Sequence, residues 1–103
     1  MTFDEYQRAT SRTRNHVLSS DDQLLDAAAG LAEEGGEVLS LVRKHRFQGR
    51  ELDQKRLVEE LGDALWCIAT AASTLGISLE QIASANIEKL ETRHPKGFVP
   101  PGR

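Results

Sequence analysis

Two pairs of acidic residues with helical i, i+3 spacing lie within apolar stretches of the chain. Glu34 and Glu37 form the first pair, and Glu60 and Asp63 form the second. Residues three apart share one side of a helix, so each pair presents two carboxylates in the same direction. A projection at about 100° per residue surrounds both pairs with apolar side chains. Because unpaired buried carboxylates are very unfavourable, four of them facing one interior favour a divalent metal site.

The same acids have a second interpretation, which is a solvated groove or ion pairs with Arg and Lys of another subunit. Periodicity alone leaves both interpretations open. The absence of Cys and of a paired His from the set favours a hard cation, Mg²⁺ or Mn²⁺, over zinc. Mg²⁺ held by a few carboxylates keeps positions for water and substrate phosphates, which is the usual arrangement in nucleotide chemistry.

Another acidic pair with the same spacing, Glu88 and Glu91, serves as an internal control. It lies opposite the apolar side of its helix, so we expect it to face water. Glu91 and His94 also form a Glu-x-x-His pattern, which occurs in di-iron bundles. Such a site needs two of these motifs and further inward carboxylates, whereas this single motif points outward and ends at Pro95. The sequence therefore disfavours di-iron chemistry.

A candidate phosphate-binding set, Asn86, Lys89 and Arg93, has i, i+3, i+7 spacing near the C-terminus of the chain. An amide and two cations at the border of an apolar stripe can bind phosphate oxygens. Alternatively, Lys89 and Arg93 only extend over apolar surface and interact favourably with the helix C-terminus. The nearby carboxylate pairs favour phosphate binding.

Four helices must position these groups, because apolar residues recur every three to four positions and strand signals are nearly absent. We therefore predict an all-α fold of the four-helix-bundle type. Residues 1–94 would form one domain, and residues 95–103 an extended tail that begins at Pro95. Capping boxes and stop signals predict helices over residues 2–15, 19–46, 53–75 and 78–93. The inner side of the first helix would carry Phe3, Tyr6, Thr10, Thr13 and Val17.

Gly30, Gly35 and Gly36 interrupt the second of these segments, and each interior glycine costs about 0.5–1 kcal/mol relative to alanine. A loop that splits the segment into two helices is one explanation. We predict an unbroken helix instead, because the apolar stripe stays in register from Leu31 to Leu41. The missing side chains would then admit another helix or a ligand close to the backbone.

The bulk properties narrow the class of protein. The chain has 103 residues, a net charge of −3 and one cysteine, Cys67, so neither a nucleic-acid partner nor a disulfide framework is expected. It lacks a long apolar segment and has a polar N-terminus, which predicts a cytoplasmic protein without a membrane span or signal peptide. The third predicted helix is apolar on nearly all sides, which predicts a homo-oligomer.

The acidic motifs also resemble a known family. Residues 33–37 read EEGGE, and residues 59–63 read EELGD some two dozen positions later. This pattern, together with FDEYQ at residues 3–7 and NIEKLETRHPKGF at residues 86–98, is similar to the MazG-like, all-α nucleotide pyrophosphohydrolases. The two acidic motifs in this order and at this separation are fairly specific, and the likeness covers nearly the whole chain.

The resemblance implies a four-helix bundle that assembles as a homodimer or homotetramer. It also implies that the protein hydrolyses nucleoside triphosphates to monophosphates and pyrophosphate with Mg²⁺. It implies metal ligands at Glu34, Glu37, Glu60 and Asp63, with Glu33, Glu34 and Glu37 as the catalytic acids and Glu33 as a candidate general base. Asn86, Lys89 and Arg93 would contact the phosphates. Cys67 stands where many members have an aromatic residue, so Trp66, Tyr6 or Phe98 would contact the nucleobase.

Two other functions are consistent with these residues. One is a non-catalytic scaffold or regulatory bundle that retains the metal site for stability. The other is a pyrophosphohydrolase that acts on a different pyrophosphate-containing substrate, such as a phosphoribosyl nucleotide. Nucleotide turnover separates the first from an enzyme, and a substrate panel identifies the second.

Overall fold

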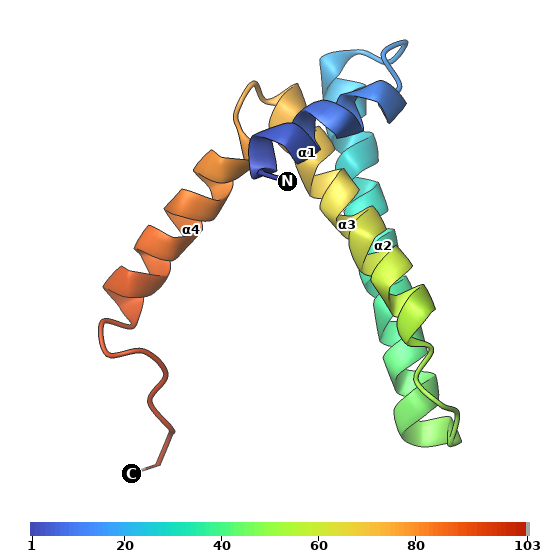
Figure 1. Ribbon diagram of the computed structural model, residues 1–103, viewed down its shortest axis with the longest axis vertical. Coiled ribbons are helices and arrows are strands. Elements are labelled where there is room, and N and C mark those ends of the chain that lie inside the picture. The colour runs from blue at the N-terminus through green and yellow to red at the C-terminus, as the bar shows by residue number, and fades with distance from the viewer. Residues whose placement is uncertain (103) are drawn as a thin grey trace.

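The computed structural model describes residues 1–102, which form four α-helices, one 3₁₀ turn and no β-strand in that range (Figure 1). The elements are α1 (Phe3–Thr10), η1 (Ser11–Thr13), α2 (Ser20–Gln48), α3 (Gln54–Thr74) and α4 (Leu79–Arg93). The predicted all-α fold is confirmed. No helix continues beyond Arg93, and residue 103 of the predicted tail lies outside the described residues.

Helices α2 and α3 form a long antiparallel hairpin (Figure 1). The helix α2 is continuous through all three glycines, as predicted. Gly30 allows a close approach, since a Cβ there would come within 2.9 Å of the Sγ of Cys67 on α3. Gly49 ends α2 with a positive φ of 66°, and the side chain of Asp53 then caps the first turn of α3.

The prediction that the first helix continues to Asn15 was wrong, because α1 ends at Thr10 and a 3₁₀ turn follows. Two threonine hydroxyls compete with helix continuation: Thr10 donates to the carbonyl of Gln7, and Thr13 donates to that of Thr10. The Thr13 hydroxyl also accepts the indole N–H of Trp66 on α3 at 2.7 Å. Val17, predicted on the inner side, is 94% exposed.

Helix α4 begins at a Ser78–Gln81 capping box, ends at Arg93 as predicted and diverges from the α2–α3 hairpin (Figure 1). The turn that precedes it is attached to α1 through the Gln7 side chain, whose oxygen accepts the backbone N–H of Leu79. Within residues 1–102, no single helix has the length and apolar character to cross a membrane. Helices α3 and α4 are bent by 102° relative to each other, and they reach the length and apolar content of a membrane span only when the two are counted together.

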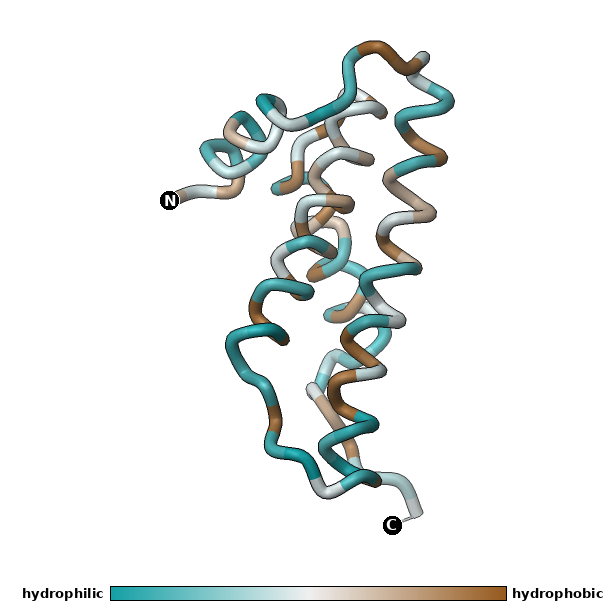
Figure 2. Tube along the Cα trace, turned by 90° about the vertical axis from the view of Figure 1, so that its right-hand side faces the viewer, coloured by the Kyte–Doolittle hydropathy of each residue, from teal (hydrophilic) through white to brown (hydrophobic). Residues whose placement is uncertain are grey.

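Within residues 1–102, the buried apolar side chains are small except for one leucine, namely Ala27, Cys67, Ala69, Ala72 and Leu79. Its accessible surface is 8055 Å², whereas a folded monomer of 11.4 kDa typically exposes about 5,800 Å². Its radius of gyration of 16.8 Å likewise exceeds the value of about 13 Å for a compact domain of this length. Figure 2 shows hydrophobic positions along the whole length of the structure rather than at a single centre.

Candidate metal centre

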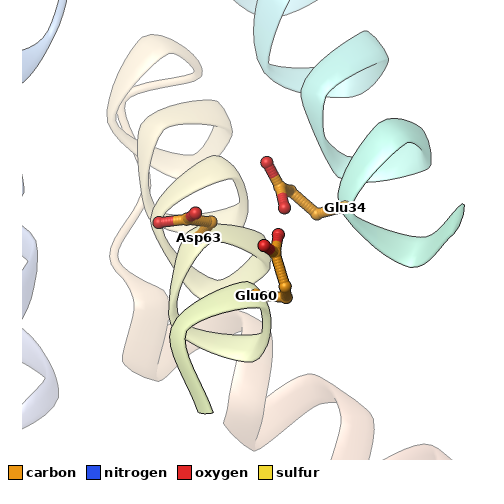
Figure 3. A group of neighbouring side chains, drawn as sticks. All are labelled: Glu34, Glu60 and Asp63. Carbon is orange, nitrogen blue, oxygen red and sulfur yellow. The ribbon is translucent and has the colours of Figure 1, made fainter. Parts of the chain in front are cut away.

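Three of the four predicted metal ligands converge between α2 and α3. Glu34 projects from α2, and Glu60 and Asp63 project from α3 (Figure 3). One carboxylate oxygen from each lies within 4.8 Å of the other two. The i, i+3 spacing places Glu60 and Asp63 on the same side of α3, and the antiparallel pairing of the two helices brings Glu34 opposite them. We name these three residues the acidic trio.

The acidic trio concentrates negative charge around Glu34. Its Oε2 atom is buried without a hydrogen-bond partner in the described chain, because neighbouring carboxylates cannot donate to it while ionised. Protonation would allow a hydrogen bond with Glu60, and this is the main cause that raises the pKa of Glu34 to about 7. Partial burial contributes next, followed by the charges of Glu60, Asp63 and Glu33.

The fourth predicted ligand, Glu37, lies beside the acidic trio and pairs instead with an arginine of α3. Its Oε2 is 4.0 Å from Nη2 of Arg56, whose Nε is 3.7 Å from Oε1 of Glu60. The Glu60 side chain is 14% exposed, and that of Glu37 is 48% exposed. Sequence reasoning overlooked Arg56, although its i, i+4 spacing to Glu60 could have indicated the pair.

A divalent cation suits the acidic trio. An oxygen-only donor set selects a hard cation, and the unpartnered Oε2 of Glu34 is the kind of buried acceptor that a metal ion satisfies. A bound cation would also offset the mutual repulsion of the three carboxylates, to which the raised pKa of Glu34 responds. The residues present therefore fit Mg²⁺ or Mn²⁺.

Tyr6 and Cys67 lie close enough to the acidic trio for its charges to act on their pKa values. Burial raises the pKa of the Tyr6 hydroxyl, and the charges of Asp63 and Cys67 raise it further. Burial also raises the pKa of the Cys67 thiol, with Glu34 as its strongest charged neighbour. The Tyr6 ring lines a cavity of about 180 Å³ with Met1, Thr2, Phe3 and Leu65, whereas the half-buried Trp66 is engaged with Thr13.

The predicted phosphate-binding residues lie elsewhere in the chain. Asn86, Lys89 and Arg93 are exposed on α4. Lys89 and Arg93 line a shallow depression of about 290 Å³ with Ala85, Glu88 and Thr92. Because α4 diverges from α2 and α3, a single chain does not bring these side chains onto the acidic trio (Figure 1). Glu33, the candidate general base, is exposed on α2 beside Glu34.

Comparison with known proteins places this arrangement in a family. The family model of the MazG nucleotide pyrophosphohydrolase domain matches residues 23–98, which include the acidic trio, Glu37 and the α4 cations. The chain belongs to the MazG family. This family is one of nucleotide pyrophosphohydrolases, so the family predicted from the acidic motifs is confirmed. Tyr6 lies outside the matched MazG segment.

Two relatives extend the MazG comparison. The Gene 37 protein of Mycobacterium phage L5 is 30% identical over 107 residues, which cover 96% of this chain and 94% of the phage protein. The protein YvdC of Bacillus subtilis (strain 168) is 36% identical over 72 residues, which cover 61% of this chain and 68% of YvdC. No solved structure matches the chain.

Proposed function

We propose that this MazG protein is a Mg²⁺-dependent nucleoside triphosphate pyrophosphohydrolase that releases a nucleoside monophosphate and pyrophosphate. One observation carries the proposal: Glu34, Glu60 and Asp63 converge within 4.8 Å of one another inside the matched MazG segment. Three carboxylates with an unpartnered buried oxygen have little use in a simple helical scaffold, because their repulsion destabilises it.

The chain's own residues supply the roles that this reaction needs. The acidic trio would hold Mg²⁺, or Mn²⁺ as an alternative, and Glu37 would complete the set by turning from Arg56. Bound there, the cation would screen the triphosphate charge and lower the pKa of a bound water. Water would attack the α-phosphorus while the bond to the bridging oxygen breaks and pyrophosphate leaves. Glu33, exposed beside the acidic trio, would accept the proton of the attacking water.

The proposed enzyme is a homodimer or homotetramer. Its surface excess of about 2,300 Å² over a monomer of its mass is the size of a permanent interface. Since α4 diverges from the acidic trio, we propose that Asn86, Lys89 and Arg93 reach the phosphates bound by a neighbouring subunit.

Tyr6, near the acidic trio, is a better candidate for the nucleobase contact than Trp66, whose indole is bonded to Thr13. The proposed location of the enzyme is the cytoplasm.

The test of this function is a product analysis. The purified protein is incubated with each canonical ribo- and deoxyribonucleoside triphosphate and Mg²⁺, and the products are separated by anion exchange. Monophosphate and pyrophosphate in equal amounts support the proposal. Orthophosphate would place the cut elsewhere, and cation binding without turnover of any triphosphate would favour the scaffold. A phosphoribosyl nucleotide in the panel tests the alternative substrate class, and analytical ultracentrifugation tests the oligomer.

A further inference from the structure

Arg56 is the only cationic side chain that pairs with an acid within the described residues. The chain contains 13 Lys and Arg and 16 Asp and Glu. Within residues 1–102, however, there are two ion pairs with an N–O distance of 4.0 Å or less, and both involve Arg56. One pair joins it to Glu37 on the opposite helix, and the other joins it to Glu60 of the acidic trio. The guanidinium thus bridges α2 and α3 at the edge of the metal centre.

The position of Arg56 is fixed by the start of its helix. The side chain of Asp53 caps α3 by accepting the backbone N–H of Arg56 at 3.1 Å. The Arg56 backbone is therefore held in the first turn of α3, one turn before Glu60. Its side chain is 56% exposed, so the guanidinium itself is free to turn toward solvent. The Glu60 carboxylate, whose side chain is 14% exposed, would then need another positive charge as its partner.

We propose that Arg56 is the internal counter-ion of the metal-free centre and that it binds a phosphate oxygen of the nucleotide once the metal is bound. This inference rests on the proposed function. Glu37 and Glu60 cannot serve a divalent cation and a guanidinium equally well, because the two positive charges repel each other at this distance. Released from the carboxylates, the planar guanidinium offers two parallel N–H donors that match a phosphate group.

Two opposite effects follow for a substitution of this one residue. Arg56→Gln removes a competitor for Glu37 and Glu60, so the metal-free protein should bind a cation more tightly. Exposed ion pairs are weak, so the expected gain is about two- to fivefold. The same substitution removes a charge-assisted contact to phosphate, which should weaken nucleotide binding about tenfold. A residue with a purely structural role would not shift the two affinities in opposite directions.

The experiment compares Arg56→Gln with Lys55→Gln in the full chain. Lys55 is the adjacent exposed cation on α3, and it has no acid within ion-pair distance in residues 1–102. Mn²⁺ binding without nucleotide is followed by electron paramagnetic resonance. Binding of an α,β-methylene nucleoside triphosphate with Mg²⁺ is followed by calorimetry, and circular dichroism checks the fold. Neither binding measurement requires turnover, so a failure of the proposed hydrolysis leaves this test intact.

Tighter Mn²⁺ binding together with weaker analogue binding in Arg56→Gln, and neither change in Lys55→Gln, would support the proposal. Weaker Mn²⁺ binding would overturn it, because Arg56 would then organise the carboxylates for the metal rather than compete with it. Unchanged analogue binding would overturn the phosphate contact. Equal effects in the two variants would reduce Arg56 to general surface charge, which also overturns the proposal. Arg56→Lys should keep the competition with the cation and lose part of the analogue affinity.

Discussion

Gly30 of α2 faces Cys67 of α3 so closely that a methyl group on residue 30 would lie 2.9 Å from the Cys67 sulfur. The thiol is buried, so it has little room to move away. We expect Gly30→Ala to destabilise the protein by about 1–2 kcal/mol, since the steric cost of overpacking exceeds the gain in helix propensity. Urea unfolding followed by circular dichroism measures the change.

A matched pair of variants separates this contact from a general glycine effect. Gly35 lies on the same helix, and a methyl group on it would meet no neighbouring side chain within 4 Å, so Gly35→Ala should stabilise by about 0.5–1 kcal/mol. In a Cys67→Ala background, the loss caused by Gly30→Ala should disappear because the sulfur is absent. A Gly30→Ala protein as stable as the wild type would show that the two helices lie farther apart.

The helices were predictable from the sequence because their ends carry local signals, such as the caps Asp53 and Ser78 and the stop at Gly76. The convergence of Glu34 with the α3 acids followed from spacing and apolar surroundings. The end of α1 did not follow from apolar periodicity, because the hydroxyls of Thr10 and Thr13 bond to backbone carbonyls there and compete with helix continuation. The pairing of Glu37 with Arg56 depends on which side chains of α2 and α3 come into contact. Helical periodicity predicts the side on which a residue lies but not its partner on the other helix.

The raised pKa of Glu34 predicts how the metal-free protein responds to pH. Its pKa is about 7 in the folded chain against 4.5 ordinarily, so the folded state holds this proton more strongly. The associated stability is complete below pH 4.5 and is lost as the pH rises toward 7. With a chelator present, the melting temperature of the wild type should fall relative to that of Glu34→Gln as the pH rises over this range. Added Mg²⁺ should remove the difference.

The comparison with Glu34→Gln cancels the contribution of the acids that lie away from Glu34, so the remaining difference reports on Glu34 and the carboxylates coupled to it. The variant should also fail to show the Mg²⁺-induced rise in melting temperature at pH 8. If the wild type and the variant melt in parallel from pH 4 to pH 8 in chelator, the carboxylates are too far apart in solution to repel one another.

Asp63→Asn is expected to lower turnover by more than about 100-fold while leaving helicity intact. Loss of residues that only support metal ligands typically costs 10- to 100-fold, so loss of a ligand should cost more. Asp21→Asn is the control, because Asp21 is an exposed acid in the first turn of α2, thirteen positions before Glu34. Steady-state kinetics with saturating Mg²⁺ measures the effect. Equal rates in Asp63→Asn and Asp21→Asn would remove Asp63 from the centre.

Gln7 is expected to set the direction of α4. Its Nε2 donates to Ser73 Oγ at 3.0 Å and to the carbonyl of Ile77 at 2.9 Å, while its Oε1 accepts the N–H of Leu79 at 2.7 Å. Gln7→Ala leaves these groups without partners, so we expect a loss of about 2–3 kcal/mol and faster hydrogen exchange at the start of α4.

Because α4 carries Asn86 and Lys89, the Gln7→Ala enzyme should also show a raised KM for nucleotide with unchanged Mn²⁺ affinity. Gln7→Glu should lose the two donated bonds but keep the one that Leu79 donates, which gives an intermediate effect. Gln54→Ala is the control, since this exposed glutamine makes no side-chain hydrogen bond within residues 1–102. An unchanged KM together with faster hydrogen exchange in α4 would mean that the phosphates are bound without this helix.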